Sequence, residues 1–159
     1  MADAYSVRGA DRLQQRLAEL ARRVPAARGG MLYHAGEAIR AFMVDSYLSG
    51  QRLRRISGRL AGRFSTVLRG DDEAVVGSQL VYAGPHEFGF QGVVSVRPFM
   101  RARTRGGAKT IAVRGHARQM NVRPKYYARD AARFGAPTAT KAAEAVFQRI
   151  AREVSGGNA

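Results

Sequence analysis

The sequence predicts an α+β fold in which N-terminal helices and a C-terminal helix pack on an antiparallel β-sheet with a projecting basic β-hairpin. Apolar residues repeat with a helical period near both ends of the chain. Between about positions 62 and 119 they alternate with polar residues, and Gly-rich turns separate these segments. A length of 159 residues with 45% hydrophobic content suits one domain spanning 1–159.

Two helices are expected between positions 11 and 48. The first, 11–24, carries an apolar stripe at i, i+4, i+7 and i+11, formed by Leu13, Leu17, Leu20 and Val24. It should end before Pro25, because the residue that precedes a proline disfavours the helical conformation. A second helix should run from about 30 to 48 and stop at Ser49-Gly50. Residues 49–61, which contain four arginines, are then expected to form a mobile basic loop.

A β-sheet with a hairpin is expected over 62–119. Alternation through 64–68, the turn Gly70-Asp71-Asp72 and the return run 74–76 predict one hairpin. Residues 80–82 should form a third strand. A second, longer hairpin with a basic tip and basic flanks is predicted from two similar segments, Val94–Arg101 and Ile111–Arg118, which the Gly106-Gly107 stretch joins.

The last helix is expected over 137–154. Pro137 is a favoured first helical residue, and Gly156-Gly157 follows the final apolar position. The stripe on this helix consists of Ala143, Val146, Phe147, Ile150 and Val154. Upstream of the helix, Pro124 should open a short aromatic turn that contains Tyr126 and Tyr127.

Positive charge is concentrated in two windows of the chain. The net charge is +15; residues 51–69 contribute +6 and residues 97–133 contribute +10, so the remainder nets −1. The chain has 24 Arg and 3 Lys, and a guanidinium suits bidentate contacts with carboxylate or phosphate. A general compositional bias toward Arg would spread the charge evenly, so the clustering points to polyanions or acidic partner surfaces.

The segment Tyr82–Gly89 is the strongest candidate site in the sequence. Its adjacent His86 and Glu87 could act as a general-base pair, bind a metal, or serve in a structural corner in which one residue caps backbone groups. The chain has no cysteine, and its other histidines, His34 and His116, show no metal-ligand spacing. Neither a Gly-x-Ser-x-Gly elbow nor a phosphate-binding loop is present. We therefore expect no catalytic, cofactor or metal site, with a hydrolase that uses His86 and Glu87 as a weaker hypothesis.

Nucleic-acid binding is a second reading of the basic windows. Arginines and Lys109 of the 97–109 region could neutralise phosphates and give a salt-dependent affinity without sequence preference. Few aromatic residues interleave with them, and no known nucleic-acid-binding motif is visible. No apolar run approaches the roughly 20 residues that span a bilayer, and the N-terminus lacks a signal core or lipidation motif, so no membrane association is expected.

The corner resembles the signature of phage tail-completion (neck) proteins, which are small minor tail components of long-tailed bacteriophages. The matching residues are Tyr82-Ala83, followed after two positions by His86-Glu87-Phe88-Gly89. Upstream, Ser57-Gly58-Arg59-Leu60 is similar to the Thr/Ser-Gly-x-Leu element of the family, and Gly77-Ser78 to its Val-Gly-Ser step. Downstream, Asn121–Ala131 occupies the place of the family's Pro-x-x-Phe-Leu-Arg-x-Ala turn, although Tyr126-Tyr127-Ala128 replaces the usual Phe-Leu and Arg97-Pro98-Phe99 is a competing match.

This resemblance implies a non-enzymatic structural virion protein. It would form a ring of six copies between the head-completion (adaptor) complex and the tail-tube protein, as a tail-completion or a tail-terminator component, and would reside in host cytoplasm during assembly. DNA would pass through its lumen. The corner residues expected to set the fold and a subunit contact are Tyr82, His86, Glu87, Phe88 and Gly89. The basic residues expected to face neighbouring rings or DNA are Arg52, Arg54, Arg55, Arg97, Arg101, Arg103, Arg105, Arg114 and Arg118.

Overall fold

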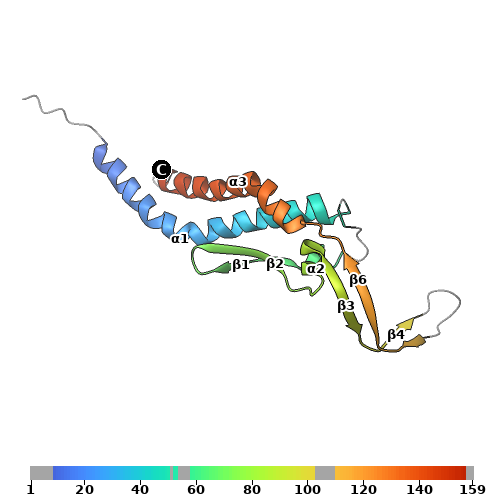
Figure 1. Cartoon of the computed structure of the whole chain (residues 1–159). Helices are drawn as coiled ribbons and strands as arrows, with labels where there is room; N and C mark the ends of the chain where they lie inside the picture. The colour runs from blue at the N-terminus through green and yellow to red at the C-terminus, as the bar shows by residue number, and fades with distance from the viewer. Residues whose placement is uncertain (1–8, 51, 54–57, 103–109, 157–159) are drawn as a thin grey trace, which may run out of the picture. The chain divides into compact units, whose positions relative to one another are not determined.

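The computed structural model describes residues 9–50, 52–53, 58–102 and 110–156. It contains helices and antiparallel strands, which confirms the α+β class (Figure 1). The chain divides into two compact units, Met1–Gln79 with Tyr127–Ala159 (unit 1) and Leu80–Tyr126 (unit 2). The predicted tip of the second hairpin, and with it Arg103 and Arg105, lies outside the described residues, as do Arg54 and Arg55 of the predicted 49–61 loop.

The N-terminal part of unit 1 is one long helix, not the two helices that the sequence predicts. Helix α1 spans Ala10–Met43 and continues into a π-helical turn, Val44–Leu48. Pro25 lies inside α1, where it removes one backbone donor but does not stop the helix. A proline in a helix interior costs about 3 kcal/mol. Helix α1 packs against the second long helix of the unit, and we attribute its continuation through Pro25 to this tertiary packing.

The C-terminal helix begins ten residues earlier than predicted. Helix α3 spans Tyr127–Gly156, and Pro137 lies inside it and not at its start. Three residues of the predicted stripe, Val146, Ile150 and Val154, are buried as expected, whereas Phe147 remains 40% exposed. The additional turns bury the small residues Ala131 and Gly135, and Ala139 near the predicted start is buried too; none of the three carries a strong apolar signal in the sequence.

Helices α1 and α3 run side by side and enclose the core of unit 1 (Figure 1). Its central cluster consists of the buried residues Met43, Leu48, Tyr127 and Ala131. The Phe64 and Tyr127 rings meet edge to face with centroids 5.8 Å apart. At Gly135 a Cβ would lie 3.1 Å from Phe42 Cδ1, so the absence of a side chain allows the Phe42 ring to rest on the backbone of α3.

The predicted first hairpin is confirmed in unit 1. After a 3₁₀ turn, Ala61–Arg63, strand β1 (Phe64–Arg69) pairs antiparallel with β2 (Glu73–Ser78). Gly70 opens the turn with a positive φ of 62°. Helix α1 packs on this hairpin, and Gly36 is the point of closest approach, because a Cβ there would be 2.5 Å from Thr66 Cγ2.

An ion pair borders this contact between α1 and the hairpin. The Arg40 guanidinium donates hydrogen bonds to both Glu37 carboxylate oxygens, the shortest of them 2.7 Å long. Arg40 is the main reason that the pKa of Glu37 lies below its ordinary value; the nearby Thr66 hydroxyl is a second cause. Thr66 Oγ1 itself is buried and makes no hydrogen bond of standard geometry within the described residues.

Unit 2 consists of a short helix and two successive two-stranded ladders. Helix α2 spans Ala83–Phe88; β3 (Phe90–Val96) pairs antiparallel with β6 (His116–Val122), and β4 (Phe99–Ala102) pairs with β5 (Thr110–Val113). We call the four strands β3, β4, β5 and β6 together the arm. The third strand predicted at 80–82 is wrong: these residues form a turn, and Val81 is 93% exposed, which removes the burial that would favour a strand.

The two ladders of the arm are separated by a break that contains a proline. Pro98 cannot donate a ladder hydrogen bond, and it lies against Gly115 of the returning chain, where a Cβ would be 3.2 Å from Pro98 Cδ. The ribbon changes direction at this point (Figure 1). The single antiparallel sheet of the prediction is therefore three separate two-stranded sheets within the described residues.

Replacing Gly36 with alanine should destabilise unit 1. The added methyl group would overlap Thr66 and touch Ala74, so we expect Gly36→Ala to lower the free energy of unfolding by about 1–3 kcal/mol. Gly30→Ala is the matched control, because Gly30 lies in the same helix with no atom near its Cβ position; it should raise stability by about 0.5–1 kcal/mol. Urea denaturation measures both, and equal effects of the two variants would contradict the packing described here.

Candidate functional site

The corner Tyr82–Gly89 is a short helix whose C-terminal end is closed by the chain that leaves the arm. The main-chain N–H of Lys125 donates to the carbonyl of His86 at 2.9 Å, and that of Tyr126 donates to Glu87 at 3.1 Å. These bonds satisfy carbonyl groups that a helix end leaves without partners. They also hold together the two chain segments at the base of the arm.

Gly89 makes this closure possible for two separate reasons. Its φ of 82° belongs to the left-handed region, which favours glycine. A Cβ at this position would also lie 3.0 Å from Pro124 Cδ and 3.1 Å from the Val122 carbonyl oxygen. On the opposite side of the joint, Tyr126 adopts a positive φ of 49°, and its N–H bond to Glu87 supports this less favourable conformation.

The corner side chains lie in different environments. Glu87 is only 5% exposed, whereas its neighbour Phe88 is 74% exposed. The His86 ring is half-buried and meets the Tyr82 ring edge to face with centroids 6.2 Å apart. The adjacent His86 and Glu87 thus differ in burial, and Tyr82 is the ring that contacts His86. In the described residues no group of three or more His, Asp or Glu could hold a metal ion.

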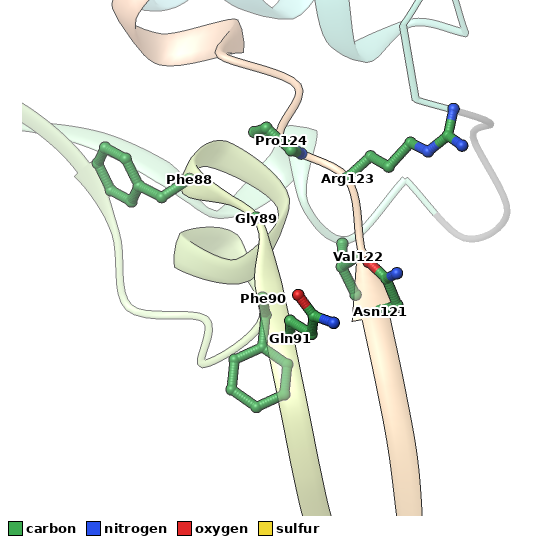
Figure 2. Close-up of a pocket in the computed structure, with 8 residues that line it drawn as sticks. All are labelled: Phe88, Gly89, Phe90, Gln91, Asn121, Val122, Arg123 and Pro124. Carbon is green, nitrogen blue, oxygen red and sulfur yellow. The ribbon is translucent and has the colours of Figure 1, made fainter.

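An open groove of about 380 Å³ lies between the end of the corner and the base of the arm (Figure 2). Gln91 and Asn121, which are register partners on β3 and β6, face one another there. The Phe88 and Phe90 rings turn away from β6, and Arg123 extends toward the opposite side. The groove is lined by Phe88, Gly89, Phe90, Gln91, Asn121, Val122, Arg123 and Pro124.

Arg52, one of the predicted contact arginines, is engaged within unit 1. Its guanidinium pairs with the Asp130 carboxylate at 2.5 Å and lies over the Tyr47 ring, 4.4 Å from the centroid. Arg52 is the main cause that lowers the pKa of Asp130, whose side chain is 14% exposed; Arg129 contributes less. Arg52 therefore joins the segment after α1 to the first turn of α3. Tyr47 and Asp130 are not among the predicted site residues, although Asp130 stands out as the single acid in the window 97–133.

The arginines of the arm differ from Arg52. Arg97, Arg101, Arg114 and Arg118 are exposed, and none forms an ion pair with another residue in the parts of the arm that the structure describes. The ladders place Arg118 opposite Val94 and Arg101 opposite Ile111. The five described members of the predicted basic set thus divide into Arg52, which has an internal partner, and four arm arginines whose charge faces outward.

Comparison of the chain with protein-family models, known curated proteins and solved structures finds no match. Among the helices that the structure describes, none has the length and apolar character needed to cross a membrane.

Substituting Gly89 should open the joint at the base of the arm. Alanine at this position is strained by the positive φ and collides with Pro124, so Gly89→Ala should weaken the hydrogen bonds donated by Lys125 and Tyr126. Hydrogen exchange of these two amides, followed by NMR, should become at least about tenfold faster. Gly84→Ala is the control, because its Cβ position in the same helix is open. Similar exchange in both variants would show that Gly89 is not required.

Removing Arg52 should destabilise unit 1 in a pH-dependent way. Because the pKa of Asp130 is lowered, the pair stabilises the fold above the ordinary carboxyl pKa, and this stabilisation is lost as pH falls through the lowered value. Arg52→Ala should therefore lower the urea midpoint at neutral pH, and the difference from wild type should shrink near pH 2. Arg118→Ala, which removes an arginine with no described ion pair, should leave the midpoint unchanged at both pH values. A pH-independent loss for Arg52→Ala would contradict the ion-pair explanation.

Proposed function

We propose that this chain is a structural protein of the head–tail neck of a phage or phage-derived particle. In this proposal it forms a tail-completion or tail-terminator ring of six copies that joins the tail tube to the head-completion or adaptor complex. It acts without catalysis, assembles in the host cytoplasm and resides in the finished virion. DNA passes through the lumen of the ring.

The order of short motifs along the chain supports this proposal. The Ser-Gly-x-Leu element at 57–60, the Gly-Ser step at 77–78 and the corner at 82–89 follow one another as in the tail-completion family. The Gly-Ser step lies at the end of β2, and the corner is the helix α2 that precedes the arm. Main-chain hydrogen bonds close this helix, and the Glu87 side chain is buried. Both features suit a structural role for the corner.

The observation that carries the proposal is the scarcity of buried side chains in unit 2. Among its described residues only Ala83 and Glu87 are buried, although the arm forms two regular ladders. Two-stranded ribbons are at best marginally stable when nothing covers them. A protein that works inside an assembly gains the missing contacts from its neighbours, whereas a protein that works alone does not.

Non-specific nucleic-acid binding is the second candidate, and the outward-facing arm arginines favour it. Arg97, Arg101, Arg114 and Arg118 have no described internal acid, so their charge is available to phosphates. This function predicts affinity for random duplex that falls steeply with salt. It is compatible with a neck protein whose lumen conducts DNA.

Electron microscopy of particles that lack this chain tests the neck proposal. Without it we expect separate heads and tails, or tails of abnormal length, and complementation with the wild-type chain should restore joined particles. Gly89→Ala should complement poorly and Gly84→Ala normally, because only the first substitution disturbs the corner. Normal numbers of joined particles with full-length tails in the absence of the chain would overturn the proposal.

A further inference from the structure

The arm displays apolar side chains on both of its faces. Directly opposed residues of an antiparallel pair share a face, so Phe99, Arg101 and Ile111 lie on one face of β4–β5, and Met100 lies on the other. Phe99 is 47% exposed, Ile111 48% and Met100 65%. In β3, Val93 is also 65% exposed. A ribbon that is apolar on two faces suits insertion into a recess better than contact with a flat surface.

The same ribbon offers main-chain hydrogen-bonding groups along its outer edges. In the described part of the arm each strand pairs with one neighbour only, so one edge of β4 and one edge of β5 have no strand beside them. Unpaired edges accept an added strand from another protein. Exposed apolar side chains beside unpaired strand edges are typical of surfaces that bind other proteins.

The arm is also of a single charge sign. No Asp or Glu occurs between Phe88 and Arg129, and residues 90–122 contain seven basic residues. Among the residues that the structure describes, Arg97, Arg101, Arg114 and Arg118 form no ion pair. A stable contact with the arm must supply the negative charge, because desolvating several like charges together without counter-charges is costly.

A second copy of the chain is a poor source of that negative charge. Unit 2 has 9 basic and 1 acidic residue, and unit 1 has 18 basic and 11 acidic residues, so both are net positive. Two residues of the single run of acids, Asp71-Asp72-Glu73, already have basic neighbours: Asp72 pairs with Arg28, and Glu73 lies opposite Arg69 in the hairpin. Electrostatic repulsion therefore disfavours contact between the arm and a second copy of this chain.

Nucleic acid supplies negative charge, but it does not supply partners for the exposed apolar side chains or for the unpaired strand edges. Phosphates would pair with the arginines, yet Met100, Ile111 and Val93 have no flat ring on which bases can stack, and Phe99 is the single aromatic residue in β4 and β5. A duplex would also leave the strand edges unpaired. A protein can supply acidic side chains for the arginines, apolar side chains for the exposed apolar residues, and main-chain groups for the strand edges.

We propose that the arm docks into a different protein, through a recess that is apolar in its centre and acidic at its rim. The inference rests on the proposed function and deepens it. Within a neck, the arm would contact a neighbouring component of other composition, and copies of this chain would contact one another through unit 1.

Binding of defined peptides to the full-length chain tests this inference. The probe is a fluorescent eight-residue strand peptide that alternates Glu with Val or Ile. The comparison probes are its Lys counterpart, an octamer of Glu alone and a random duplex of about 20 base pairs. Anisotropy at about 150 mM salt should show the Glu/Val/Ile peptide binding at least about tenfold more tightly than each of the other three.

Two pairs of substitutions locate the binding. Arg101→Glu with Arg118→Glu, and separately Phe99→Ser with Ile111→Ser, should each weaken binding of the Glu/Val/Ile peptide at least about tenfold. Arg12→Glu with Arg22→Glu makes the same charge change on exposed positions of α1 and should alter binding less than about threefold. The urea midpoint of each variant reports whether unit 1 remains folded.

Four outcomes overturn the inference: no binding of the Glu/Val/Ile peptide at about 100 µM, equal binding of the Glu-only octamer, tighter binding of the duplex, or self-association in sedimentation that the arm substitutions abolish. None of these depends on particle assembly. If the peptide result fails while deletion of the chain still separates heads from tails, the neck function stands and the docking inference alone is wrong.

Discussion

The close approach of α1 and α3 is the constraint on which unit 1 depends. It requires small residues on α3: Ala131 is completely buried, and at Gly135 the Phe42 ring fills the place of a side chain. Because the helices lie this near, Tyr127 reaches Phe64 of the hairpin, and Asp130 comes within range of Arg52. A larger residue at 131 or 135 would displace the aromatic contact and the ion pair together, so local packing sets long-range geometry here.

The sequence predicted the fold class and the first hairpin because their signals are local. Alternation in 64–68 and the glycine turn at 70 report burial and backbone conformation directly. Both prolines misled the prediction for one reason: their local cost is real, but tertiary packing of two long helices exceeds it. The stripe Ala131, Gly135 and Ala139 gave no signal, since small residues carry little hydrophobic weight even when their role is to permit contact.

The corner was recognisable as a special segment, but its conformation was not. Leu80-Val81-Tyr82 has strand-like composition, and only the three-dimensional structure shows that Val81 is exposed and that a helix follows. Likewise, the pairing of Arg52 with Asp130 joins residues 78 positions apart, which periodicity does not report. The two units also differ in kind. Unit 1 encloses a core of its own, whereas unit 2 presents its apolar and charged groups outward.

The joint at the base of the arm is made chiefly of main-chain atoms. Lys125 and Tyr126 donate backbone N–H groups to backbone carbonyls, bonds that need no particular side chain at 125 or 126, and Gly89 and Pro124 fit closely beside them. The strands of the arm can therefore lengthen, shorten or change composition during evolution while these two main-chain hydrogen bonds are kept. A lineage that keeps this joint can alter the surface of the arm without changing the core of unit 1.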